Sequence, residues 1–299
     1  MFSHYSLIRI SLIACFALGL SACGSSSPPA PTLTPAPTPT PEPPTATSEP
    51  MALTVNGEGI TVVDFNAEVQ RYITSQQGLG KTVTPQDAAN AVKEDLTAQL
   101  LLAQAAHSSG FTLDAAGLQA RVDALAAQVG GAEALSAWEA AHGYTDQAFR
   151  SGLKRQAESA WMRDKILAEV PSTAEQVHVQ QILLYNQDQA QSFLMQLNGG
   201  ADFDELAVKA DPSTHGDLGW VPRGYLLDPK IEEAAFTLAV GEHSEVISTD
   251  AGFDIIRVLA REPQRPLSPD AYLALQELAL KKWIDEHRQQ ANITFAMQP

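Results

Sequence analysis

The stretch Gly216-Asp217-Leu218-Gly219-Trp220 decides the fold of this 299-residue chain, because it stands inside an ordered series of expected elements. Its two glycines indicate a turn that leads into a strand. A second glycine-rich stretch, Gly252-Phe253-Asp254-Ile255-Ile256, follows it. Periodicity and capping signals predict strands at 177–184, 216–221, 245–248 and 253–260 and helices at 187–197, 203–210 and 229–236. The order β-α-α-β-α-β-β predicts an α+β domain.

From Glu175 to Arg261 this order and both glycine-rich stretches resemble the parvulin family of peptidyl-prolyl isomerases. The resemblance implies a parvulin domain at residues 171–263 that catalyses rotation about the amide bond before proline. That rotation breaks no bond, and its barrier is about 20 kcal/mol. Binding the twisted amide about 4 kcal/mol more tightly than the planar amide gives a thousandfold acceleration, so we expect no cofactor.

The resemblance also implies a pocket for the proline ring. Matched position by position, this pocket falls on Leu218, on Leu226 or Leu227, and on Ile231. Ile231 is smaller than the aromatic side chain that the family usually has there, and we expect Phe253 to compensate. Packing in the core of the domain is the alternative explanation for each of these apolar residues.

The polar centre implied by the resemblance departs from the family pattern. Gln181 and Asp254 stand where most members carry histidine. Asp211 matches the acidic or cysteine position that faces the substrate amide, and Thr249 matches a hydroxyl position. Because glutamine donates hydrogen bonds and a carboxylate accepts them, we hypothesise that a Gln181–Asp254 hydrogen bond holds the centre together. If Asp254 lay close to Asp211, their like charges would raise the pKa of one of them.

Other polar residues suggest no second site. His178, His215 and His243 lack the spacing of metal ligands, so we expect no metal. The acidic residues at 202–205 fall in the first turn of a helix, where capping and the helix dipole explain them. The sequence contains no nucleotide-binding loop and no nucleophile motif.

The N-terminal region predicts export. Arg9 precedes the apolar run 10–20, which at about eleven residues is too short to span a bilayer and is typical of a signal peptide. Residues 20–24 resemble a bacterial lipobox, which implies removal of residues 1–22, lipidation of Cys23 and an extracytoplasmic protein anchored to the membrane. A secretory signal with an incidental cysteine is the alternative. Residues 23–50 are rich in proline and threonine and predict an extended linker.

Residues 51–170 predict a helical domain that begins with a strand and a tight Asn56-Gly57 turn at residues 55–59. Capping residues and glycine stops place helices at 62–76, 85–109, 115–129, 132–142 and 145–170. A further helix at 269–289 is apolar on one side and needs a partner, so we expect residues 264–299 to pack on the N-terminal helices. Helices before and after a parvulin unit resemble the exported foldases of the PrsA and SurA type.

The charge and the resemblance leave two functions open. A net charge of −16 argues against nucleic acid and anionic membrane surfaces as partners. The first function is an isomerase that is tethered by its N-terminal lipid and assists the folding of unfolded or proline-containing exported polypeptides. The second is a chaperone whose helical part holds unfolded chains while the parvulin unit is catalytically weak. The clients and the oligomeric state do not follow from the sequence.

Overall fold

The computed structural model describes residues 49–226 and 228–296, and these form two compact units. The described part of the first unit comprises residues 49–100, 112–157 and 292–296, and the second unit comprises residues 101–111 and 158–291. The expected signal peptide, the expected linker up to residue 48, Cys23 and Leu227 lie outside the described residues. Within the described ranges no helix has the length and apolar character needed to cross a bilayer.

A three-stranded antiparallel sheet of order β2-β1-β7 lies in the first unit. Its strands are β1 (Met51–Val55), β2 (Glu58–Thr61) and β7 (Ile293–Phe295). Asn56 and Gly57 join β1 to β2 with φ angles of 51° and 89°, as a tight hairpin turn requires. The strand and tight turn expected at residues 55–59 are present, but they belong to a hairpin that extends over residues 51–61 and pairs with β7, which we did not expect. The three residues of β7 are too few to show a strand periodicity.

The helices of the first unit begin and end close to where their capping residues predict. They are α1 (Val62–Gly78), α2 (Pro85–Ser108), α3 (Ala115–Val129), α4 (Ala132–Ala141) and α5 (Asp146–Ala168), of which α2 and α5 continue into the second unit. The Thr61 hydroxyl accepts the Asp64 amide at 3.1 Å at the start of α1, and Gly130 ends α3 in the left-handed conformation. Phe65 of α1 is fully buried and meets the Phe295 ring edge to face, with centroids 5.3 Å apart.

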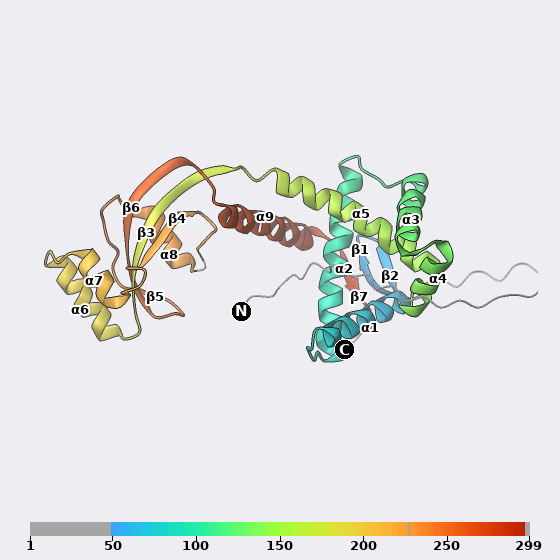
Figure 1. Ribbon diagram of the computed structural model, residues 1–299, viewed down its shortest axis with the longest axis horizontal. Helices are drawn as coiled ribbons and strands as arrows, with labels where there is room; N and C mark the ends of the chain where they lie inside the picture. Colours follow the sequence, from blue (N-terminus) through green and yellow to red (C-terminus); the bar gives the residue numbers. More distant parts are fainter. Residues whose placement is uncertain (1–48, 227, 297–299) are drawn as a thin grey trace, which may run out of the picture. The chain divides into compact units, whose positions relative to one another are not determined.

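The second unit contains a four-stranded antiparallel sheet of order β4-β3-β6-β5 (Figure 1). Its strands are β3 (Thr173–Leu184), β4 (Asp217–Pro222), β5 (Ile247–Ser248) and β6 (Phe253–Pro266). The helices between them are α6 (Gln187–Asn198), α7 (Phe203–Ala210) and α8 (Pro229–Thr237). The predicted order β-α-α-β-α-β-β and the α+β fold class are confirmed.

Each face of this sheet has its own apolar core. Ile182 and Ile255 pack with α6 and α7 on one face, whereas Val179 and Ile256 pack with α8 on the other. Consecutive residues of a strand point to opposite faces, which explains why Ile255 and Ile256 belong to different cores. The face that a side chain occupies therefore determines which helix it contacts.

Helix α9 (Pro269–Gln290) follows the sheet and begins at Ser268, whose hydroxyl accepts the Ala271 amide at 3.2 Å. Its apolar residues, among them Leu280, Trp283 and Ile284, pack against the last turns of α2 and α5. The expected contact with the preceding helices is thus present. The two compact units nevertheless divide α2 and α5, so they do not coincide with the boundaries predicted at residues 170 and 263, and those boundaries stay predictions.

The contacts of Phe295 with Leu53 and Phe65 predict that it stabilises the first unit. Phe295→Ala should lower the free energy of unfolding by about 2 kcal/mol, because it removes apolar contact area and the edge-to-face pairing with Phe65. Urea unfolding followed by circular dichroism measures the change. The control Val63→Ala alters a side chain that is 73% exposed and should change stability by less than about 0.5 kcal/mol. Equal stability of Phe295→Ala and the parent protein would contradict a role for β7.

Candidate functional site

A buried carboxylate lies at the centre of the candidate site. Asp254 of β6 is 1% exposed, and both of its oxygens accept hydrogen bonds. The Gln181 side-chain amide donates to Oδ1, and the Thr249 hydroxyl donates to Oδ2 at 2.8 Å. The hypothesised Gln181–Asp254 hydrogen bond is therefore present. Two donors offset part of the cost of burying the charge, so the three side chains form one connected polar centre.

Strand register and one turn bring these side chains together. Gln181 lies opposite Ile256 in the β3–β6 pair, which makes Asp254 its diagonal neighbour on the same face. Thr249 and Gly252 close the β5–β6 turn, in which the Thr249 amide donates to the Gly252 carbonyl at 2.9 Å. A Cβ at Gly252 would lie 2.5 Å from the Leu184 carbonyl oxygen. Glycine at this position therefore lets the turn approach β3 closely enough for Thr249 to reach the centre.

Asp211 ends α7 and organises the loop that follows it. Its carboxylate accepts the Thr214 hydroxyl, the Ser213 amide at 2.9 Å and the Thr214 amide at 3.3 Å. These hydrogen bonds, that of the Thr214 hydroxyl first, hold the pKa of Asp211 below its usual value of 3.8. The charge of Asp254 is not among the causes. We considered that a nearby Asp254 charge would raise the pKa of one of the two aspartates. At Asp211 this does not occur, because its pKa is lowered.

Gly216, which opens the motif that decided the fold, holds this loop against β3. Its carbonyl accepts the Gln181 amide at 2.8 Å, and its φ is +68°. A Cβ at this position would lie 1.8 Å from the Gln181 carbonyl oxygen, a distance that no side chain tolerates. The loop that carries Asp211 therefore rests directly on the backbone of Gln181, and only glycine permits this contact.

The expected pocket residues occupy different surroundings. Ile231 is 6% exposed and packs with the half-buried Leu226 in the core on the α8 face. Leu218 is 37% exposed, belongs to neither core and lies where the β3–β4 pairing is irregular. We expected Phe253 to fill the space beside Ile231. Phe253 instead packs in the opposite core with α6 and α7. Among the described members of this set, Leu218 is thus the apolar residue most open to a ligand.

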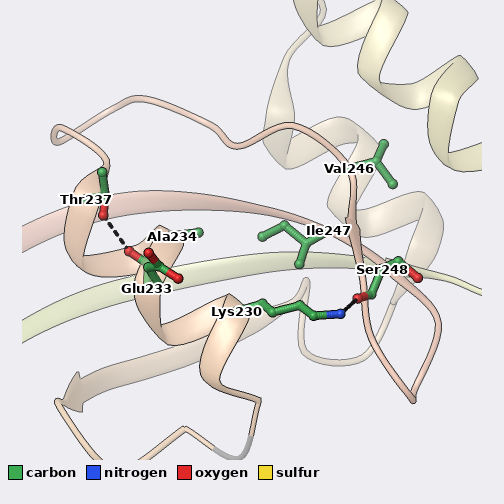
Figure 2. A pocket seen from close by; sticks show the side chains of 7 residues that line it. All are labelled: Lys230, Glu233, Ala234, Thr237, Val246, Ile247 and Ser248. Atoms are coloured by element: carbon green, nitrogen blue, oxygen red, sulfur yellow. Dashed lines mark hydrogen bonds between the residues drawn. The ribbon is translucent and has the colours of Figure 1, made fainter.

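A groove lies between α8 and β5 (Figure 2). Ile247 in its lining pairs with Asp254 of the polar centre. The groove has a volume of about 490 Å³, and its lining consists of Lys230, Glu233, Ala234, Thr237, Val246, Ile247 and Ser248. The Lys230 ammonium donates to the Ser248 carbonyl at 2.6 Å, and Ser248 is next to Thr249 in the chain. Sequence reasoning missed this groove, because two segments that give separate sequence signals form it together.

Histidine and acidic residues near the site have structural partners. His178, which we did not expect to bind metal, pairs with Asp217 at 2.8 Å. The Asp217 carboxylate also accepts the Gly219 amide at 2.8 Å, which assigns the aspartate of the motif to its own turn. Asp202 caps α7 by accepting the amides of Asp204 and Glu205. Among the described residues, no group of histidine, cysteine and acidic side chains has the arrangement of a metal site.

Comparison with known proteins agrees with this geometry. The family model described as "PPIC-type PPIASE domain" matches residues 169–272. A "Parvulin-like PPIase" of Rickettsia bellii is 32% identical over 138 residues, which are 42% of this chain and 48% of that protein. The chain contains a parvulin-type domain. This parvulin domain comprises β3 to β6 with α6, α7 and α8.

Further relatives share the parvulin domain and have other names. A "Foldase protein PrsA" of Geobacillus kaustophilus is 36% identical over 94 residues, or 30% of this chain and 33% of that protein. The chain thus spans half or less of the length of these curated relatives. A crystal structure of PrsA from Bacillus anthracis aligns with 66% of this chain over 95% of the PrsA chain. The two are 20% identical, and the TM-score is 0.41.

The buried centre predicts different effects for two substitutions of Asp254. Asp254→Ala should lower the free energy of unfolding by about 2 to 3 kcal/mol, because the donors of Gln181 and Thr249 lose their acceptor. Asp254→Asn keeps an acceptor for Gln181, and its amide can donate to the Thr249 hydroxyl, so the loss should be about 1 kcal/mol. Urea unfolding of the three proteins tests this order. Unchanged stability of Asp254→Ala would show that the polar centre does not stabilise the domain.

Proposed function

We propose that this protein is a peptidyl-prolyl isomerase and that its parvulin domain performs the catalysis. The observation that carries the proposal is the assembled polar centre, in which Gln181 and Thr249 both donate to the buried Asp254. Hydrogen bonds connect the three side chains of the centre without a histidine. It also holds the β5–β6 turn against β3, the strand on which the Asp211 loop rests.

The physical basis of catalysis would be the difference between a planar and a twisted amide. Twisting ends the resonance of the C–N bond, so the carbonyl oxygen loses part of its negative charge and the amide becomes less polar. Apolar surroundings such as Leu218 therefore favour the twisted form over the planar form. The Asp211 carboxylate, whose pKa is lowered from its usual value, disfavours negative charge on a nearby carbonyl oxygen. Both effects act on the transition state more than on the ground state.

One observation favours the alternative, a chaperone with a weak catalytic domain. The Asp211 carboxylate already accepts hydrogen bonds from Ser213 and Thr214 within its own loop. A carboxylate occupied in this way interacts less with a substrate amide. The helical first unit would then provide most of the activity by holding unfolded chains.

An isomerisation assay on proline-containing peptides, with no protease present, separates the two functions. We expect the full chain to accelerate cis–trans exchange and Asp211→Asn to lower kcat/KM by about tenfold or more, which is 1.4 kcal/mol of transition-state stabilisation. Lys282→Ala, at a side chain that is 73% exposed, is the control and should have no effect. Absence of catalysis together with suppressed aggregation of an unfolded protein would contradict the isomerase and support the chaperone.

We also propose that the mature protein is attached to the extracytoplasmic side of a bacterial membrane through Cys23 and acts on exported polypeptides. The lipobox-like residues 20–24 and the apolar run 10–20 support the anchor. The printed name "Foldase protein PrsA" of a relative supports folding as the task.

Mass spectrometry of the mature protein tests this anchor. We expect an N-terminal Cys23 with acyl chains, and Cys23→Ser should release the protein from the membrane fraction. An unmodified N-terminus at another residue would contradict the proposal. A matched Ser25→Ala variant should stay anchored.

A further inference from the structure

Two consecutive glutamines of β3 serve opposite faces of the sheet. Gln181 donates to Asp254, whereas Gln180 lies on the other face and is 5% exposed. The side-chain oxygen Oε1 of Gln180 accepts a hydrogen bond from Nη2 of Arg257 at 2.7 Å. The side-chain amide Nε2 of Gln180 donates to the backbone carbonyl of His215 at 2.9 Å. Both ends of this buried side chain are therefore used, as a buried amide requires.

Arg257 connects this glutamine to the start of α7. It lies directly opposite Gln180 in the β3–β6 pair, and its Nη2 also donates to Asp204 at 2.6 Å. Its guanidinium carbon lies 4.7 Å from the centre of the Phe203 ring. The Nε atom of Arg257 is buried without a hydrogen-bond partner. The contacts with Gln180, Asp204 and Phe203 thus set the orientation of the guanidinium.

The network holds both ends of one segment of chain. Phe203 and Asp204 begin α7, Asp211 ends it, and His215 closes the loop beyond. His215 has a φ of +54°, which is strained for a residue with a side chain, so its position depends on the contacts that hold it. The hydrogen bond from Gln180 is one of these contacts. Contacts of Gln180 in β3 and Arg257 in β6 with the two ends of this segment therefore determine the position of Asp211.

We propose that Gln180 and Arg257 are positioning residues for Asp211, an inference that rests on the proposed isomerase function. They contact the loop and α7 from the face opposite to the polar centre, so they act through the place of Asp211 and not on the substrate. Two faces of one sheet thereby control the site. Gln181 anchors the centre on one face, and Gln180 with Arg257 anchors the loop on the other.

Kinetics of substituted proteins test the inference. Gln180→Met keeps the length of the side chain and removes both hydrogen bonds. We expect kcat to fall about tenfold with KM within about twofold, because an interaction that matters in the transition state is disturbed. In the Asp211→Asn background the same change should lower kcat by less than about twofold, because the residue through which it acts is already altered. Equal effects in both backgrounds would overturn the inference.

Arg257→Lys and Arg257→Met provide a graded second test. Lysine can keep a contact with Asp204, so its kcat should lie between those of the parent and of Arg257→Met. If Gln180→Met does not fold, this pair keeps the inference testable. The matched control is Arg163→Met, which removes an exposed pair with Asp164 at 2.6 Å in α5 and should change neither kcat nor KM. Equal kcat values for Arg257→Lys and Arg257→Met, both below that of the parent, would show a merely structural role.

A measurement that needs no catalysis separates this inference from the proposed function. The Asp211 carboxyl, followed by NMR during an acid titration, should have a pKa below 3.8 in the parent protein. In Gln180→Met it should rise toward 3.8, because a displaced loop no longer directs the Ser213 and Thr214 donors at the carboxylate. If the parent shows no isomerase activity but this rise occurs, the proposed function fails and the positioning of Asp211 stands. An unchanged pKa in a folded variant would overturn the inference itself.

Discussion

The pairing of β3 with β6 extends over most of both strands and determines where Gln181 and Asp254 of the polar centre lie. It makes Asp254 the diagonal neighbour of Gln181, and it places Gln180 opposite Arg257. A slip of one residue would move each of these side chains to the other face of the sheet. Register at this pair is therefore the constraint that the cores, the loop contacts and the carboxylate environment share. The separate apolar cores on the two faces hold that register in place.

The centre shows that a hydrogen-bonded group can be maintained with other residue types than those usual in the family. A glutamine and an aspartate form a donor–acceptor pair whose direction is fixed, because a carboxylate only accepts. Thr249 takes the second oxygen. The result is a centre whose geometry is determined by two hydrogen bonds to Asp254 and by the close approach of Gly252 to β3.

Local signals in the sequence were sufficient for most of the fold, and register was the missing information. Thr61, Asp202 and Ser268 cap helices that begin where the sequence predicts, because a cap involves only neighbouring residues. The partner of Gln181 was also found, through resemblance. The face occupied by Phe253 and the role of Gln180 were not found, because each depends on which residue of a distant strand lies opposite. The short strand β7 was not predicted for the same reason, because its partner β1 is far from it in the sequence.

The pairing of β7 with β1 has a consequence for the order of folding. A chain that emerges from a ribosome or a translocation channel presents residues 51–55 before the parvulin domain and residues 293–295 after it. The first unit cannot complete its sheet until then, although the residues of α1 to α5 precede the parvulin domain in the chain. The parvulin domain lies between these strands in the chain and can acquire all of its own strands earlier. The sheet of the first unit can therefore be completed only after the parvulin domain has been synthesised.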